Sequence, residues 1–373
     1  MIRASFEQIP PISGDLSSLF NFIYLLLFLV FMLYGQKIQM LNMLREVRGA
    51  LNHLKALRDK AREVAISSVK KVGSPNDDPT ERIDQFLEYF TIMPSSLDPA
   101  GIVPKIEHIL DVRHKRFEDE VRMIAPSATD AQVSNLEGVL EVAMGLNYIY
   151  RIVRHYYLLG KKTMSYILIM QTQMQLPLIM RQAKAFSAAV KAFAYGQPIG
   201  DGAGALVAAK MMHGKEVKKI AKDVVAAELS IDNRKVYVLK AEGPGAKVGK
   251  YGDAVRKLIE KHNGKISTII TVDAASKFEG EETGSTSEGV GTAIGGVGVI
   301  QFKVEEVASR YKIPLNAVVI KESIIDSVSP MKKAIIKGVD EAIKKVRRLI
   351  NEKTKEGDTV IVVGIGNTVG IAQ

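Results

Sequence analysis

The chain has 373 residues, of which 47% are hydrophobic, and it carries a formal net charge of +10 at pH 7. This length and composition are sufficient to bury a full core, and they predict two folded units. The sequence contains no cysteine, which excludes disulfides, cysteine-ligated zinc sites and thiol nucleophiles.

An uncharged run at residues 16–36 follows a short N-terminal segment, residues 1–15. A helix of that length is long enough to span a bilayer. A cleaved signal peptide is the weaker alternative, because the apolar run is too long and no small-residue cleavage site follows it. The sequence therefore predicts one N-terminal transmembrane helix, with the lipid bilayer as a partner.

The segment after this run, residues 37–72, is strongly basic. It holds nine Lys or Arg residues against three acidic ones, so it supplies six of the ten net positive charges. The positive-inside rule then places the N-terminus outside the cell membrane and the bulk of the chain in the cytoplasm. Basic residues beside a membrane meet anionic lipid headgroups, and no aromatic-and-basic stripe is present, so nucleic acid is not expected as a partner. Apolar spacing predicts a helical stalk here, either a coiled coil or an ordinary amphipathic helix.

Turn-forming residues end the stalk, and residues 73–195 read as an all-α region. Helices are predicted from Thr80 and over residues 106–121 and 131–160. A second uncharged stretch, Thr163 to Met180, contains several glutamines and Pro177. Because amide side chains are costly inside a bilayer, this stretch predicts a buried helix or one that faces another copy in a homo-oligomer.

The pattern changes at residues 196–373, where apolar strand-like runs alternate with helical ones. Such alternation is typical of an α/β domain with a mostly parallel, doubly wound sheet and helices on both faces. The turn at Ile231–Arg234 also predicts a hairpin. Candidate strands are residues 223–229, 235–240, 266–272, 317–320 and 359–363, and candidate helices are residues 202–213, 251–263, 303–312 and 331–354.

Glycines and polar residues gather where strands are expected to end, which is where ligands bind in α/β sheets. Asp201 precedes an apolar helix, so a capping role is an open alternative for it. Asp273 ends an apolar strand, and a carboxylate there is costly unless it is hydrogen-bonded, metal-bound or open to a cleft. Around these acids we expect a ligand-binding set made of Gly200, Gly202, Gly204, Gly364, Gly366 and Asn367.

The loop after Asp273 adds further acids, Glu279, Glu281, Glu282 and Glu288. This loop either attracts hard cations or forms a solvated flap. Glycine runs that begin at Gly289 and Gly364 imitate dinucleotide fingerprints but lack the strand and helix that give the motif its meaning. Nucleotide sensing through backbone N–H groups at a helix N-terminus stays a third alternative.

Two segments, Leu97–Val103 and Gln197–Gly202, together with the N-terminal span, resemble an uncharacterised archaeal family of single-pass membrane proteins. The resemblance covers nearly the whole chain and implies no activity. Residues 196–373 also resemble, more distantly, the hydrogenase-maturation endopeptidases and the spore germination protease. Those proteins have a Gly-Asp loop and a second acid at the end of a strand, as at Asp201 and Asp273.

In those peptidases a strand ending in Gly-x-Gly-Asn comes just before the Gly-Asp loop. Here the same signature is Gly364-Ile-Gly-Asn367, close to the last residue given. The resemblance therefore implies a circular permutation. We expect this last strand to insert into the sheet and to bring Asn367 close to Asp201.

The resemblance implies that Asp201 and Asp273 are paired catalytic carboxylates, which share a proton or hold a divalent metal and activate water for amide hydrolysis. No histidine follows His262, so the nickel-sensing histidine of the hydrogenase-maturation enzymes has no counterpart. The all-carboxylate germination protease is thus the nearer comparison. Apart from that metal, no cofactor is indicated.

Two functions stay open at this point. One is a membrane-anchored, cytoplasmic-facing hydrolase of peptidase-like fold with a carboxylate-lined cleft. The other is a non-catalytic, membrane-anchored binding or scaffold protein that oligomerises and senses a small ligand.

Overall fold

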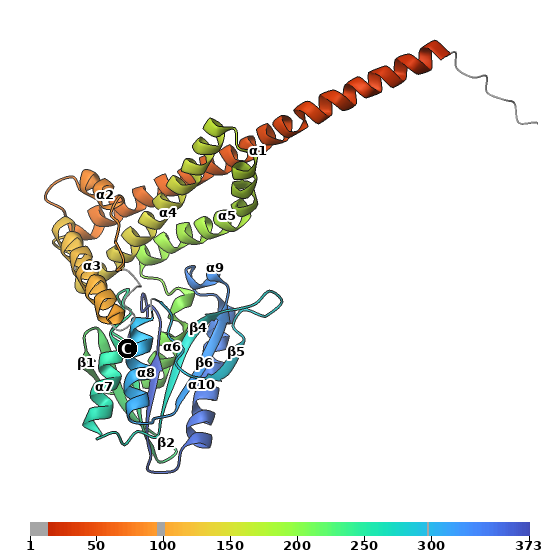
Figure 1. The fold of residues 1–373 in the computed structure, drawn as a ribbon. Helices are drawn as coiled ribbons and strands as arrows, with labels where there is room; N and C mark the ends of the chain where they lie inside the picture. Colours follow the sequence, from red (N-terminus) through yellow and green to blue (C-terminus); the bar gives the residue numbers. More distant parts are fainter. Residues whose placement is uncertain (1–13, 95–100, 297) are drawn as a thin grey trace, which may run out of the picture. The chain divides into compact units, whose positions relative to one another are not determined.

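The computed structural model describes residues 14–94, 101–296 and 298–373. The chain divides into two compact units, and each unit combines distant segments. The first joins the residues up to His53 with Arg151–Pro177, and the second joins Leu54–Tyr150 with Leu178–Gln373. Figure 1 follows the chain from the helical N-terminal region to the α/β C-terminal domain. The segment predicted as residues 1–15 lies almost wholly outside the described residues.

Helix α1, Gly14–Gly73, contains both the predicted span and the predicted stalk. Within the described ranges, no single straight helix has the length and apolar composition needed to cross a membrane. Two parts of α1, Ser18–Met32 and Tyr34–Gly73, meet at a bend of 48° and satisfy those two criteria together. The transmembrane helix therefore stays a prediction.

Four further helices complete the N-terminal region, which is all-helical as predicted. They are α2 (Thr80–Phe86), α3 (Ile102–Ile124), α4 (Asp130–Thr163) and α5 (Tyr166–Tyr195). The second uncharged stretch lies mainly on α5, where Ile169 and Leu176 are buried whereas Ile167 and Met174 are exposed. This stretch thus presents one buried side and one apolar exposed side.

The C-terminal domain contains a seven-stranded sheet in the order β1-β2-β3-β7-β4-β6-β5. Its strands are β1 (Val217–Ala221), β2 (Val224–Ile231), β3 (Arg234–Ala241), β4 (Thr268–Ser276), β5 (Thr286–Val290), β6 (Leu315–Glu322) and β7 (Thr359–Gly364). Its helices are η1 (Gly200–Gly202), α6 (Ala203–Met212), α7 (Tyr251–Lys261), α8 (Val299–Arg310), α9 (Ile324–Ser327) and α10 (Lys333–Lys353). The α/β class is therefore confirmed.

The expectation of a mostly parallel sheet is wrong, because the sheet is mixed. Strands β3, β7, β4 and β6 pair in parallel, whereas β1–β2, β2–β3 and β5–β6 pair antiparallel. The physical reason for β1–β2 and β2–β3 is the length of their connections, because a two-residue turn can join only antiparallel neighbours. Strand β5 pairs antiparallel with β6 although α8 lies between them in the sequence. The predicted hairpin at Ile231–Arg234 is confirmed, with Asp232 and Asn233 both at positive φ, as a type I′ turn requires.

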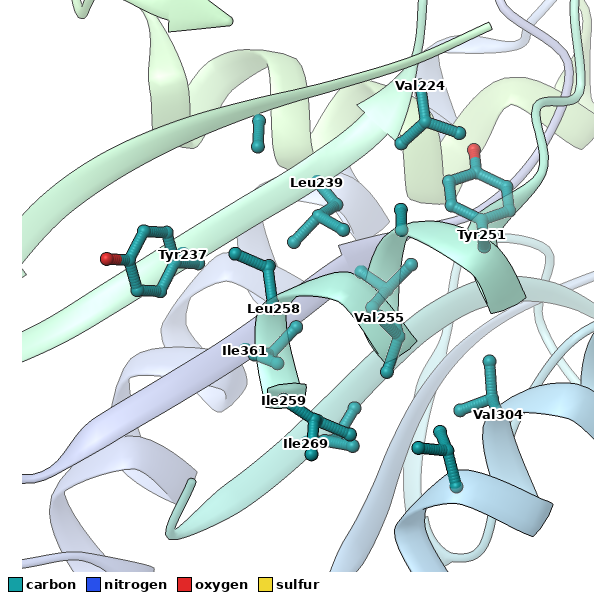
Figure 2. Packing of buried hydrophobic residues seen from close by; sticks show 14 of the residues in the cluster. Val224, Tyr237, Leu239, Tyr251, Val255, Leu258, Ile259, Ile269, Val304 and Ile361 are labelled. Atoms are coloured by element: carbon teal, nitrogen blue, oxygen red, sulfur yellow. The ribbon is translucent and has the colours of Figure 1, made fainter. Parts of the chain in front are cut away.

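Side chains of the central strands alternate between two cores, one on each face of the sheet. On β3, Tyr237 and Leu239 pack towards α7 and α8, while Val236 and Val238 pack towards α6 and α10. Figure 2 shows the first core, in which Val255 and Leu258 of α7 lie against the strand residues. Successive strand residues point to opposite faces, so a strand buried on both sides must be apolar throughout, as β7 is.

Helix α6 approaches the ends of β4 and β7 closely, and Gly204 permits this contact. A methyl group at residue 204 would overlap the carbonyl oxygens of Val272 and Ile365. Those two residues already join β4 to the segment after β7, because Ile365 N–H donates to Val272 O at 2.8 Å. The first turn of α6 is therefore held against two strand ends at once.

We expect Gly204→Ala to destabilise the C-terminal domain by about 1–3 kcal/mol, the usual cost of forcing an extra group into a packed interior. Gly49→Ala is the matched control, because Gly49 is also helical and has open space where the methyl group would be added. That change should be neutral or should stabilise by up to about 1 kcal/mol through helix propensity. Thermal unfolding followed by circular dichroism measures both; equal effects would contradict the packing argument.

Candidate functional site

Asp201 lies on η1, and its carboxylate is bonded to the segment that follows β7. Its Oδ2 accepts the backbone N–H of Asn367 at 2.9 Å. The contact exists because β7 occupies the centre of the sheet, between β3 and β4. The predicted insertion of the last strand and the predicted proximity of Asn367 to Asp201 are thus both confirmed.

The glycines expected to bind a ligand all lie at this junction. At Gly366, which has φ of 127°, an added methyl group would overlap the Asp201 carbonyl oxygen. At Gly364 it would overlap the Gly204 carbonyl oxygen. Their close approach to one another is a structural reason for glycine at these positions, independent of any ligand.

Asp273 belongs to β4, beside η1 and α6. It is 5% exposed, and its two carboxylate oxygens accept the N–H groups of Ala274 and Gly295, each at 2.8 Å. Burial and then the negative charge of Asp201 raise the pKa of Asp273 to about 7, against the opposing effect of the two N–H donors. Asp273 therefore anchors the 293–295 loop and titrates close to neutral pH.

Asp201 is half-buried as a residue, but its carboxyl group is largely screened from water, as is that of Asp273. Removal of water from its carboxyl group raises its pKa, and the hydrogen bond from Asn367 opposes this rise. Among the described residues, no side chain or backbone group donates a hydrogen bond to Asp201 Oδ1. One oxygen of Asp201 is thus held in place while the other is available.

Glu322, at the end of β6, was not predicted as a site residue. It is 2% exposed, and within the described part of the chain neither of its carboxyl oxygens has a hydrogen-bond partner. Burial and then the charges of Asp201, Asp326 and Asp273 raise the pKa of Glu322 to about 8. The signal was present in the sequence: like Asp273, Glu322 ends an apolar strand.

A fourth buried acid, Asp326, is compensated by its neighbours. It pairs with Lys332 at 2.5 Å and accepts a hydrogen bond from Thr283 Oγ1 at 3.1 Å. Burial acts to raise the pKa of Asp326, but the hydrogen bonds from Lys332 and Ser323 outweigh it, so the pKa is lowered. Asp326 therefore contributes a fixed negative charge near Glu322.

Two of the acids that follow Asp273 in the sequence, Glu281 in the loop and Glu288 on β5, lie in ion pairs. Glu281 pairs with Lys321, and Glu288 pairs with Arg348. These partners give the acids a structural role without a cation. Ion pairs of this kind contribute little to stability when they are solvent-exposed.

A metal ion is a poor fit to the two predicted ligands. Across the residues that the structure describes, no group of three or more His, Asp or Glu side chains has the spacing needed to hold a metal. Asp273 already uses both oxygens to accept backbone N–H groups. Hard divalent cations need several oxygen ligands, which Asp201 and Asp273 do not supply.

The acids at the site differ in their exposure. Asp273 and Glu322 are buried, and only Asp201 is partly open. What the arrangement provides chemically is a set of carboxyl groups close enough to raise one another's pKa. Such groups hold protons at neutral pH and can exchange them.

Comparisons with known proteins cover both halves of the chain. Residues 21–196 match a family described as "Protein of unknown function (DUF1512) N-terminal domain", and residues 199–372 match "Domain of unknown function (DUF1512) C-terminal". No curated protein shows significant similarity to the chain.

The raised pKa of Glu322 predicts a stability that depends on pH. Between its ordinary pKa of 4.5 and its folded value of about 8, the folded state binds one more proton than the unfolded state. Stability is therefore highest below pH 4.5 and falls as pH rises towards 8, by at most about 1.4 kcal/mol per pH unit. Glu322→Gln should match the wild type near pH 5 and exceed it at pH 8.5.

Melting temperatures measured between pH 5 and pH 9 test this expectation. Glu341→Gln, on the exposed side of α10, is the matched control and should follow the wild-type profile. If the melting temperature of Glu322→Gln changed with pH in parallel with that of the wild type, the pKa of Glu322 would not be raised by folding. Glu322 would then be ionised in the folded state, contrary to the expectation.

Proposed function

The chain belongs to the DUF1512 family, whose description assigns no activity, and we propose that its C-terminal domain is a peptide-bond hydrolase of peptidase-like fold. The observation that carries this proposal is the pair of carboxyl groups at the junction of η1, β4 and β7. Asp201 is half-buried with one available oxygen, and its charge contributes to raising the pKa of Asp273 to about 7. Two such groups can divide the roles of base and acid.

In this mechanism the Asp201 carboxylate accepts a proton from a water molecule. The water oxygen forms a bond to the carbonyl carbon of the substrate. The carbon–nitrogen bond then breaks, and the leaving nitrogen takes a proton from neutral Asp273. The products are a carboxylic acid and an amine, and transfer of the proton from Asp201 to Asp273 restores the starting state.

The arrangement of the two signature loops supports a peptidase-like fold. The Gly-Asp loop at Asp201 and the Gly-x-Gly-Asn loop at Asn367 lie far apart in the sequence and are hydrogen-bonded in the structure. This is the contact that a circularly permuted peptidase domain requires. A fold does not by itself determine an activity, so the test is made on the two carboxyl groups.

We also propose that the N-terminal part of α1 anchors the chain in the cell membrane, with the N-terminus outside and the bulk of the chain in the cytoplasm. Large apolar side chains between Leu19 and Met32 are exposed all around the helix. A helix that is apolar on every side needs an apolar surrounding. The basic residues that follow suit the anionic cytoplasmic face of a bilayer.

A non-catalytic scaffold is the second candidate, and one observation favours it. Asp201 and Asp273 both accept backbone N–H groups of neighbouring loops, as structural capping residues do. The apolar exposed side of α5, which includes Ile167 and Met174, would then be a contact between copies in a homo-oligomer.

Asp201→Asn and Asp273→Asn distinguish the two candidates. Each substitution should lower the rate of peptide cleavage by about 10²–10⁴-fold, the usual contribution of a general acid or base, while stability falls by about 1–2 kcal/mol through the weakened hydrogen bond. The measurement is mass-spectrometric analysis of a peptide library incubated with the full-length protein. Asp340→Asn, at a surface ion pair with Lys210, should leave cleavage unchanged.

Cleavage that persists in both variants would rule out the proposed acid–base pair. If the wild type cleaves no peptide and the two variants only melt earlier, the aspartates are structural and the scaffold is favoured.

Membrane attachment is tested with the double substitution Leu26→Lys and Phe28→Lys. Each lysine near the middle of a membrane helix costs about 2.5–3.5 kcal/mol, so the protein should move from the carbonate-resistant membrane fraction to the soluble fraction. Leu41→Lys is the control, because Leu41 is equally exposed but follows the apolar run. The proposed span would be contradicted if the double variant and Leu41→Lys lost membrane attachment equally, or if neither lost it.

A further inference from the structure

A cavity of about 360 Å³ lies between α3, α4 and the loop that follows β3. Its apolar wall includes Leu110, Phe117, Phe193 and Ile300, and Asn367 reaches it from the C-terminal segment. A second cavity of about 220 Å³ lies beside it, lined by residues of the same elements. Volumes of this size, with apolar walls and a few polar groups, are typical of small-molecule sites.

Six charged side chains on the wall of the larger cavity form three ion pairs with one another. Arg113 pairs with Glu141 at 2.7 Å, Lys250 with Asp111 at 2.6 Å and Lys247 with Asp223 at 2.7 Å. These side chains are therefore not available as strong sites for a charged ligand. Lys222 and His114, which also line this cavity, are exposed at its rim.

Glu137 differs from all of these groups. It is 8% exposed, it lines both cavities, and within the described residues it forms neither a hydrogen bond nor an ion pair. Burial, and then the charges of Glu118 and Glu141, raise the pKa of Glu137 to about 8. The charge of Arg122 acts to lower this pKa, but Arg122 is already bonded to Glu118 and Asp130.

The charged and titratable groups around Glu137 come from three parts of the fold. They are His114, Glu118 and Arg122 on α3; Asp130 and Glu141 on α4; and Lys219, Lys222, Asp223 and Lys247 of the C-terminal domain. Asp223 adds to the rise in the pKa of Glu137. Among the cations, Arg122, Lys219 and Lys247 are paired with other acids, and Lys222 is exposed to solvent. Within the described residues, no cation therefore pairs with Glu137.

We propose that this cavity binds a small organic amine, with the alkyl part against the apolar wall and the ammonium group on the Glu137 carboxylate. An ammonium ion fits better than a divalent metal, because the neighbouring acids are already paired and a metal needs several free oxygen ligands. The inference is independent of the proposed hydrolase, since it uses neither Asp201 nor Asp273.

Binding of an amine converts a neutral buried carboxyl group into an ion pair, so one proton leaves Glu137. Below pH 8 the affinity should then rise with pH, by up to about tenfold per pH unit for one released proton. An uncharged molecule of the same shape gains nothing from the carboxylate. It should bind more weakly and without proton release.

Isothermal titration calorimetry of the full-length protein with butylamine, and with butan-1-ol as the uncharged match, tests the proposal. Titrations in two buffers of different ionisation enthalpy count the released protons. We expect saturable binding of butylamine at one site, release of about one proton, and no saturable binding of butan-1-ol. Glu137→Gln should weaken butylamine binding at least tenfold, whereas Glu352→Gln, exposed on α10, should not change it.

Any one of several results would overturn the proposal: no saturable binding, equal binding to Glu137→Gln, equal affinity for butan-1-ol, or binding without proton release. If Glu137→Gln fails to fold, proton release and the preference for the amine in the wild type still decide the matter. Failure here leaves the hydrolase proposal untouched, because the peptide-cleavage test depends on other residues.

Discussion

Strands β3 and β4 do not touch each other; both pair with β7, which is hydrogen-bonded along its whole length between them. Strand β7 therefore joins the β1–β3 part of the sheet to the part made of β4, β6 and β5. The buried Tyr251 hydroxyl group strengthens this connection, because it accepts the N–H of Ala241 on β3 and donates to the Gly364 carbonyl oxygen on β7. The segment after β7 then reaches η1, where Asn367 fixes the orientation of Asp201. The position of the carboxyl cluster thus depends on the pairing of β7 with β3 and β4.

Electrostatics gives the cluster its chemical character. Asp201, Asp273, Glu322 and Asp326 lie near the carboxyl ends of the central strands, and within the described residues only Asp326 of these four forms an ion pair, with Lys332. The three remaining carboxyl groups cannot all be ionised in a buried setting without a large penalty. Burial and then the neighbouring negative charges raise the pKa values of Asp273 and Glu322 towards neutrality, so protons rather than counter-ions balance these groups. Glu137 repeats this situation on a smaller scale in the helical part of the same unit.

Local sequence patterns were sufficient for much of this architecture. Apolar runs that alternate with helical segments predicted β2, β3, β4, β6 and β7, and the turn at Asp232-Asn233 predicted the hairpin. Strands β1 and β5 were missed, because they are exposed edge strands whose residues lack an apolar run. The pairing of Asp201 with Asn367 followed only from the peptidase resemblance. Glu322 was overlooked although its position matches that of Asp273, and the burial of Glu137 depends on helix packing that no local pattern encodes.

The central place of β7 has a consequence for how the protein is made. A ribosome delivers the chain from its N-terminus, and domains generally fold in that order. The helices and β1–β3 leave the ribosome first, yet β4 and β6 have no neighbour to join them to β3 until residue 364 has emerged. Until then the nascent α/β domain presents two unpaired strand edges, which are templates for wrong pairing. The N-terminal region and six of the seven strands are therefore synthesised before β7, the strand that joins the two parts of the sheet.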